Sequence, residues 1–206
     1  DFSNYCHTHN IVVVTDTNVN YYYGGSLADY SVIEIEPGEE NKNITTVEKI
    51  HRSLLRWKAD RDTYLVGIGG GIVCDIAGFA AATYMRGIKF GFVPTTLLAQ
   101  VDASVGGKNG VNLQGFKNII GTFKQPDFVV CDPNTLGTLS YSELSNGFAE
   151  IIKHTLISDR TEFSWLEDNF QDVLALRPEA INRLVEHSIR TKASIVNQDE
   201  LEAGER

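Results

Sequence analysis

Cysteine and long apolar segments are scarce in this chain of 206 residues. Its three cysteines, Cys6, Cys74 and Cys131, are scattered and form no CxxC pair. This argues against a disulfide framework and a cysteine metal site, and it is typical of reduced thiols in the cytoplasm. No apolar run is long enough to cross a membrane, and no signal peptide is recognisable. We therefore expect a cytoplasmic location and no membrane partner.

Basic tracts are also missing. The chain carries 18 lysines and arginines against 27 acidic residues, a formal net charge of −9. Proteins that bind nucleic acid neutralise its phosphates with clustered cations, so this composition argues against a nucleic-acid partner. An anionic small substrate would have to be bound by a few lysines and arginines at specific positions, because the net negative charge of the chain repels it. The hydrophobic content of 42% suits a globular core.

The stretch from Leu65 to Gly121 organises the chain. A short apolar run, Leu65–Ile68, ends in three glycines, and apolar residues at helical spacing follow. This pattern predicts a strand, a tight turn and a helix. Glycines such as Gly70 and Gly71 let a backbone approach a ligand, and a helix N-terminus binds anions. The glycines also fit a plain turn, because Cys74 stands where the dinucleotide fingerprint has its third glycine.

A second strand is expected at Phe90–Val93, and the loop after it carries polar residues. Thr95 and Thr96 follow the strand, and Asp102 and a glycine loop that ends in Lys108 come next. Two strand ends and two glycine turns within one short stretch favour a nucleotide site with phosphate chemistry beside it. The polar residues whose combination favours this interpretation are Asp75, Arg86, Thr95, Thr96, Asp102, Lys108, Lys117 and Asn118.

Asp16 and Asn18 follow the first predicted strand, Ile11–Val14. Ligands of open α/β sheets bind at the carboxyl ends of strands, and a carboxylate there can bind ribose hydroxyls. The same Asp-x-Asn pattern is common turn chemistry, and the residues alone leave both alternatives open. Further along, an apolar run predicts a strand at Val32–Ile35, and helical periodicity predicts an amphipathic helix from Thr45 to Trp57.

The pattern changes near Leu139. A strand is predicted at Phe128–Cys131, whereas from Ser140 onward only helical patterns occur, beginning with a capping box that opens a helix to about Ser158. Further helices are predicted at 162–169 and 178–196. The expected fold class is therefore α/β: residues 1–139 form a nucleotide-binding domain with a mostly parallel sheet, and residues 140–206 begin an all-helical domain.

Glu150, Lys153 and His154 share one face of the first of these helices, because they lie three and four residues apart. A Glu and a His at this spacing can bind one metal ion. The same spacing is also ordinary on helix surfaces, so the residues alone leave the metal and the surface alternatives open.

Four segments resemble the 3-dehydroquinate synthase family of the shikimate pathway, and the resemblance runs from about Val12 to the last residue. They read GGGIVCDIAGFAAATYMRG, VPTTLLAQVDASVGGKNGVN, KNIIGTFKQP and GFAEIIKH. The resemblance implies conversion of 3-deoxy-D-arabino-heptulosonate 7-phosphate to 3-dehydroquinate and phosphate, with NAD and zinc or cobalt. Asn109 is a mild departure, since the family usually has Thr there. Another sugar phosphate cyclase and a non-catalytic NAD-binding fragment are the alternatives.

The resemblance also implies roles for individual residues. The implied NAD contacts are Asp16, Asn18, Glu39, Lys42, Gly70, Gly71, Asp75, Thr95, Thr96, Lys108, Lys117, Thr135, Leu136, Gly137 and Thr138. The implied catalytic and substrate residues are Arg86, Asp102, Lys108, Asn118, Lys153, Lys192 and Arg206.

For the metal, the resemblance implies Glu150 as one of three zinc ligands. The other two would be histidines of a motif expected beyond Arg206, and His154 has no ligand role in the family. Arg206 matches an arginine that reaches the neighbouring subunit's site, which implies a homodimer.

Overall fold

The computed structural model describes residues 2–204, and the chain divides into two compact units. The sheet unit consists of Asp1–Pro94 and Gly107–Val130, and the helical unit of Thr95–Gly106 and Cys131–Arg206. The helices predicted beyond Ser140 all lie in the helical unit, which also takes up two shorter segments before them.

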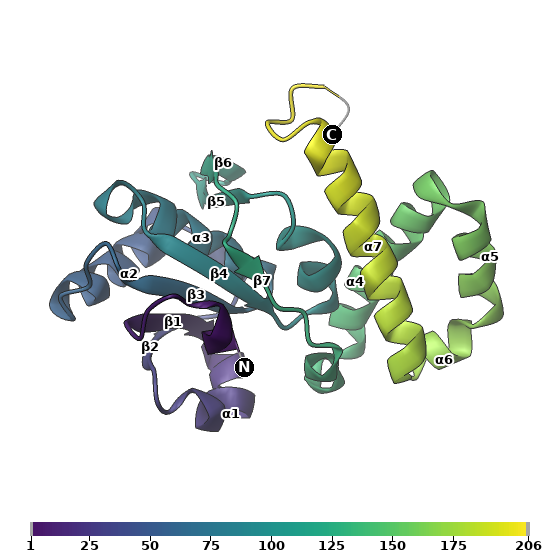
Figure 1. Cartoon of the computed structure of the whole chain (residues 1–206), viewed down its shortest axis with the longest axis horizontal. Coiled ribbons are helices and arrows are strands. Elements are labelled where there is room, and N and C mark those ends of the chain that lie inside the picture. Colours follow the sequence, from purple (N-terminus) through teal and green to yellow (C-terminus); the bar gives the residue numbers. More distant parts are fainter. Residues whose placement is uncertain (1, 205–206) are drawn as a thin grey trace. The chain divides into compact units, whose positions relative to one another are not determined.

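The sheet unit is built on five parallel strands in the order β2-β1-β3-β4-β7 (Figure 1). Their bounds are β1 Ile11–Asp16, β2 Ser31–Ile35, β3 Tyr64–Gly69, β4 Lys89–Pro94 and β7 Phe128–Val129. All six residues of β1 and of β3 are buried, in agreement with the apolar runs Ile11–Val14 and Leu65–Ile68 that form most of each strand. The predicted α/β class and mostly parallel sheet are confirmed.

Helices cover both faces of this sheet. Figure 1 shows α2 (Ile44–Arg56) and α3 (Gly71–Thr83) on one face and α1 (Thr17–Tyr23) on the other. Alternate residues of β1 accordingly belong to two different cores. Val12 and Val14 pack in the cluster that holds the apolar faces of α2 and α3, whereas Ile11 and Val13 pack with Val19 of α1.

Three elements differ from the sequence prediction. Residues 17–23 form a helix instead of a plain turn, because the side chain of Asp16 caps it by accepting a hydrogen bond from Val19 N at 2.9 Å. The glycine loop continues into an antiparallel hairpin of β5 (Lys108–Leu113) and β6 (Phe116–Phe123), which the sequence analysis did not predict. The predicted strand 128–131 ends two residues earlier, at Val129.

The hairpin packs on α3 through a close fit of Gly78 with Asn109. The Asn109 side chain is buried and donates to Gly107 O at 2.9 Å and to Lys124 O at 2.8 Å. A Cβ at Gly78 would stand 1.9 Å from Asn109 Oδ1. Glycine is therefore required at this helical position to leave room for the amide.

The helical unit contains no strand among the residues that the structure describes. It comprises a π-helical turn at Ala99–Ala103, a 3-10 turn at Pro133–Thr138, and the helices α4 Tyr141–Ser158, α5 Arg160–Asp168, α6 Phe170–Leu174 and α7 Pro178–Gln198. Ser140 caps α4 and Pro178 opens α7, as the sequence predicts. Leu97 and Val101 pack in the same core as Ile151 of α4, which explains why residues 95–106 join this unit.

None of the described helices is long and apolar enough to span a membrane.

We predict that Gly78→Ala destabilises the protein by about 2 kcal/mol, although alanine is the better helix former by roughly 1 kcal/mol. The new methyl group would displace Asn109 and break its two buried hydrogen bonds. Urea unfolding of purified variants measures the change. In an Asn109→Ala background most of the cost of Gly78→Ala should vanish, because the clash with the amide is gone and only the Phe92 ring, 3.0 Å from the new Cβ, has to shift.

Gly25→Ala is the matched control, since a Cβ there meets nothing within 4 Å. Equal effects of Gly78→Ala in both backgrounds would show that the amide is not what excludes the methyl group.

Candidate functional site

In the sheet unit, the buried ammonium of Lys42 forms the centre of a polar network. Its Nζ lies 2.5 Å from Asp75 Oδ2 and 2.5 Å from Asn118 Oδ1, and the residue is only 5% exposed. Lys42 follows β2, Asp75 lies in the first turns of α3, and Asn118 belongs to β6. Direct contacts thus bring together two implied NAD contacts, Lys42 and Asp75, and one implied substrate residue, Asn118.

Asn112 extends this network, and the sequence analysis missed it. Its Nδ2 donates to Glu39 Oε1 at 2.9 Å, and its Oδ1 accepts from Asn118 N at 2.8 Å. The same Glu39 oxygen lies 3.7 Å from Lys117 Nζ. Asn118 has a left-handed backbone with φ of 53°, which asparagine tolerates better than most residues. No local sequence signal marks Asn112, because its partner Glu39 lies 73 residues away.

The glycine turn opens α3 as predicted. Gly70 is the N-cap and Gly71 the first helical residue, and no side chain caps the helix. The first N–H groups of a helix have no partner within it. A backbone without a capping side chain fits the expected pyrophosphate better than a plain structural turn, which is usually closed by its own Ser, Thr or Asp.

Asp16 lies at the carboxyl end of β1, where the sequence analysis placed a ribose contact. One oxygen of its carboxylate caps α1 by accepting a hydrogen bond from Val19 N. Burial raises the pKa of this carboxyl above its ordinary value, although the backbone hydrogen bonds that it accepts act in the opposite direction. Asn18, in the first turn of α1, is exposed. The structure therefore shows the turn-type role of Asp16 directly and leaves the ribose contact as a proposal.

Arg86 and Lys108 are both exposed. Arg86 has φ of 67° and follows Met85 at 49°, so two non-glycine residues in succession adopt the left-handed conformation. Lys108 is the first residue of β5.

The remaining predicted cofactor residues lie in the helical unit. Thr96 accepts a hydrogen bond from Ala99 N at 3.2 Å. The hydroxyl of Thr135 donates to Asp132 O at 2.8 Å. Leu136 is a fully buried core residue, so only its backbone could meet a ligand. Thr95 is buried, whereas Gly137 and Thr138 are exposed.

A second cluster in the helical unit joins Asp102, Glu150 and His154, whose ligand atoms all lie within 4.8 Å of one another. Two lysines form ion pairs with this cluster: Lys192 with Asp102 Oδ1, and Lys153 with Glu150 Oε1. The chemistry of this donor set, two carboxylates and an imidazole, suits a divalent cation such as zinc. Glu150 thus fits the predicted ligand role.

His154 is buried, with 2% of its surface exposed, and its Nε2 lies 3.7 Å from Glu150 Oε1. Burial lowers the pKa of its imidazole, and the neighbouring lysines act in the same direction against the two carboxylates. A neutral imidazole can bind a metal ion through its unprotonated nitrogen, and it can donate a hydrogen bond to a carboxylate through its N–H.

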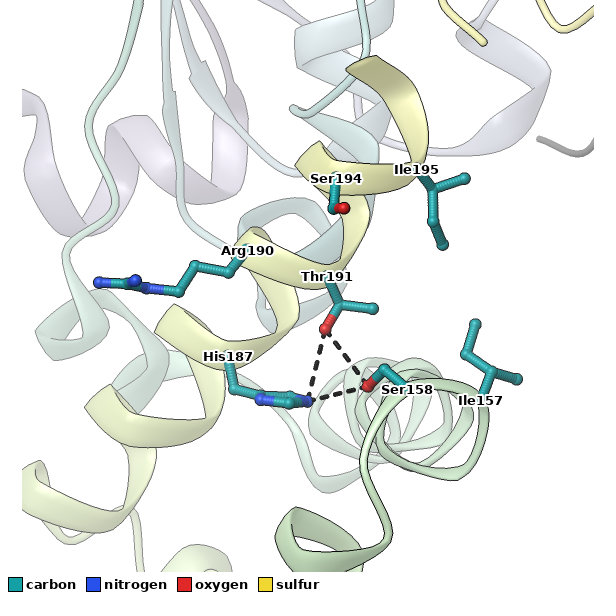
Figure 2. Close-up of a pocket in the computed structure, with 7 residues that line it drawn as sticks. All are labelled: Ile157, Ser158, His187, Arg190, Thr191, Ser194 and Ile195. Carbon is teal, nitrogen blue, oxygen red and sulfur yellow. Dashed lines mark hydrogen bonds between the residues drawn. The ribbon is translucent and has the colours of Figure 1, made fainter. Parts of the chain in front are cut away.

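A surface pocket of about 390 Å³ lies on the helical unit, lined by residues of α4 and α7. Figure 2 shows the hydrogen-bonded triangle of Ser158, His187 and Thr191 in it, with Arg190 directed away from Ser158. Its lining includes none of the residues expected from the sequence. Among those expected residues, Arg206 lies outside the described part of the chain.

Comparisons with known proteins agree with the resemblance. The sequence matches the family described as 3-dehydroquinate synthase N-terminal over residues 32–146, and the family described as 3-dehydroquinate synthase C-terminal over residues 147–206. The 3-dehydroquinate synthase of Acidithiobacillus ferrooxidans is 46% identical over 205 residues, covering 95% of this chain and 56% of the relative. The chain thus spans somewhat more than half the length of that curated relative.

Two solved structures are also similar. The 2-epi-5-epi-valiolone synthase of Streptomyces hygroscopicus, determined with NAD⁺ and Zn²⁺ bound, has a TM-score of 0.89 and 28% identity, covering 95% of this chain and 58% of the other. A 2-deoxy-scyllo-inosose synthase, complexed with carbaglucose-6-phosphate, NAD⁺ and Co²⁺, has a TM-score of 0.83 and 28% identity, covering 94% of this chain and 56% of the other.

We predict that Lys42→Met destabilises the protein by about 2–3 kcal/mol, because it removes the buried ammonium that pairs with the Asp75 carboxylate. Methionine keeps most of the aliphatic stem, so the change reports on the charge. Urea unfolding at pH 7 measures it. The double variant Lys42→Met with Asp75→Asn should cost less than the sum of the two single changes.

Lys49→Met, an exposed position on α2, is the control and should change stability by less than about 0.5 kcal/mol. Additive single changes would show that Lys42 and Asp75 do not depend on each other.

Proposed function

Because this chain belongs to the 3-dehydroquinate synthase family, we propose that the protein to which it belongs is a 3-dehydroquinate synthase. Its substrate would be 3-deoxy-D-arabino-heptulosonate 7-phosphate and its products 3-dehydroquinate and phosphate. The observation that supports the proposal is the network around Lys42, which brings together the expected NAD contacts Lys42 and Asp75 and the expected substrate residue Asn118 from three separate segments.

The sheet unit would supply the nucleotide site. The N–H groups at Gly70 and Gly71 would hold the pyrophosphate, and Asp16 and Glu39 would accept hydrogen bonds from ribose hydroxyls. Lys42 would neutralise Asp75 and keep the adjoining loop in place. Lys108 and Lys117 would border the cofactor.

The helical unit would supply the metal and substrate groups. Glu150 would hold the metal together with histidines of the remaining part of the domain, and Asp102 would orient substrate hydroxyls. Lys153, Lys192 and Arg206 of this unit are donors of the kind that bind carboxylate and phosphate, and the sheet unit would add Arg86 and Asn118.

When bound, NAD supplies a hydride acceptor that later returns the hydride, and zinc or cobalt supplies a Lewis acid. Phosphate would leave by β-elimination between the removal and the return of the hydride. Ring opening and an intramolecular aldol reaction would close the carbocycle only after the hydride has been returned. We further infer a cytoplasmic homodimer, from the scattered cysteines and from the family role that Arg206 matches.

We predict that the full-length protein releases phosphate from 3-deoxy-D-arabino-heptulosonate 7-phosphate only with NAD⁺ and a divalent metal. NADH should not accumulate, because the hydride is returned in each turnover. A chelator should abolish phosphate release, and zinc or cobalt should restore it. A colorimetric phosphate assay and absorbance at 340 nm measure the two quantities.

A sugar phosphate without a carboxylate is the control substrate. Phosphate release from that compound alone would indicate another sugar phosphate cyclase. Absence of release from both substrates, with NAD⁺ still bound, would favour a non-catalytic NAD-binding protein.

We also predict that the full-length protein binds NAD⁺ more tightly than NADP⁺, because the carboxylates of Asp16 and Glu39 repel a 2′-phosphate. Glu39→Gln keeps an oxygen for Asn112 but removes the charge, and it should narrow the preference by roughly fivefold, about 1 kcal/mol for one charge in water. Isothermal titration calorimetry with both nucleotides measures the ratio.

Glu40→Gln removes a charge at the next residue, which is exposed, and should leave the ratio unchanged. Equal or tighter binding of NADP⁺ by the unmodified protein would contradict the assignment of these carboxylates.

A further inference from the structure

His154 is a buried residue whose polar atoms are incompletely satisfied. It lies one turn after Glu150 in α4, so both side chains project from the same helix face. Its Nδ1 has no hydrogen-bond partner among residues 2–204. A purely structural histidine is usually held by such bonds, as His51 is by Ala80 O at 3.0 Å. An aliphatic residue would fill the same volume without leaving a polar atom unpaired.

The other ring nitrogen of His154 faces Glu150. Nε2 lies 3.7 Å from Oε1 of the carboxylate, and Lys153 binds the same oxygen. The second oxygen of Glu150, Oε2, has no hydrogen-bond partner in the described part of the chain. Contacts on one oxygen leave the other available to a cation.

The two groups on Oε1 differ in how firmly they are placed. The Lys153 side chain is 54% exposed, and its four-carbon stem is flexible, whereas the His154 side chain is 2% exposed. The proposed function also gives the lysine a second task, contact with an anionic substrate. The buried imidazole is therefore the group that can keep the carboxylate in one orientation when the lysine moves away.

We propose that His154 is a positioning residue that directs its Nε2–H at Oε1 of Glu150 and thereby presents Oε2 to the metal. The inference rests on the proposed function, in which Glu150 is a metal ligand. Partners of this kind behind a ligand typically alter metal affinity by roughly 10- to 100-fold when removed.

The test compares His154→Gln and His154→Leu in the full-length protein. A glutamine amide can replace Nε2–H as a donor, whereas leucine fills the space without one. We expect glutamine to keep zinc affinity within about threefold, and leucine to weaken it roughly 10- to 100-fold. Competition with a chromogenic chelator measures the affinities.

A second measurement separates positioning from a structural role. The metal-free His154→Leu protein should unfold at a urea concentration no lower than the unmodified protein, because leucine removes an unpaired polar atom. The cobalt-loaded variant should keep the visible absorption bands of the unmodified site, because no ligand is lost. His187→Gln, at a histidine bound to Ser158 in the same unit, is the control and should change neither quantity.

The results distinguish this inference from the proposed function. Glu150→Ala should lose stoichiometric metal; if it retains metal, both the ligand role and the inference are wrong. If Glu150→Ala loses metal and His154→Leu binds as tightly as the unmodified protein, only the inference is wrong. If both His154 variants lose metal as completely as Glu150→Ala, with altered cobalt bands, His154 is a direct ligand and the positioning role is overturned.

Discussion

The buried ammonium of Lys42 is the constraint on which the arrangement of the sheet unit depends. A charge taken out of water costs several kcal/mol unless it is paired and hydrogen-bonded, so the lysine requires both Asp75 and Asn118. Its partners lie 33 and 76 residues further along the chain. Lys42 therefore fixes three segments relative to one another: the loop after β2, the start of α3 and the β5–β6 hairpin. As a result, polar residues expected around a nucleotide lie together without a bound nucleotide to hold them.

The parts of the fold that could be predicted from the sequence are those in which burial is uniform along an element. β1 and β3 are buried throughout and appear as apolar runs, and α2 and α7 show helical periodicity. The hairpin has no such signal. Six of the eight residues of β6 are exposed, and it contains Lys117, Asn118 and Gly121. Its position comes from tertiary contacts, chiefly the fit of Asn109 of β5 against Gly78.

The candidate site shows a similar division. Individual residues such as Glu39 and Glu150 could be named in advance, because the resemblance to the family implies a role for each. The contacts of these residues could not be predicted, because the partners are far apart in the chain. Lys192, for example, pairs with Asp102, which lies 90 residues away in the sequence. The burial of individual side chains could not be predicted from the sequence either. Helical spacing put His154 beside Glu150, but only the packed structure shows that the imidazole is enclosed and that one of its nitrogens is unpaired.

The charges of the helical cluster connect the site with the composition of the chain. In a protein of net charge −9, an anionic sugar phosphate has to be attracted locally, and the two carboxylates of Asp102 and Glu150 would oppose it. Lys192 and Lys153 offset those carboxylates one to one in the structure. Under the proposed function the same ammoniums bind substrate, which they can do only if another cation takes over the carboxylates. A divalent metal on Glu150 would take over that carboxylate from Lys153, and it would leave the cluster with the positive charge that an anionic substrate needs.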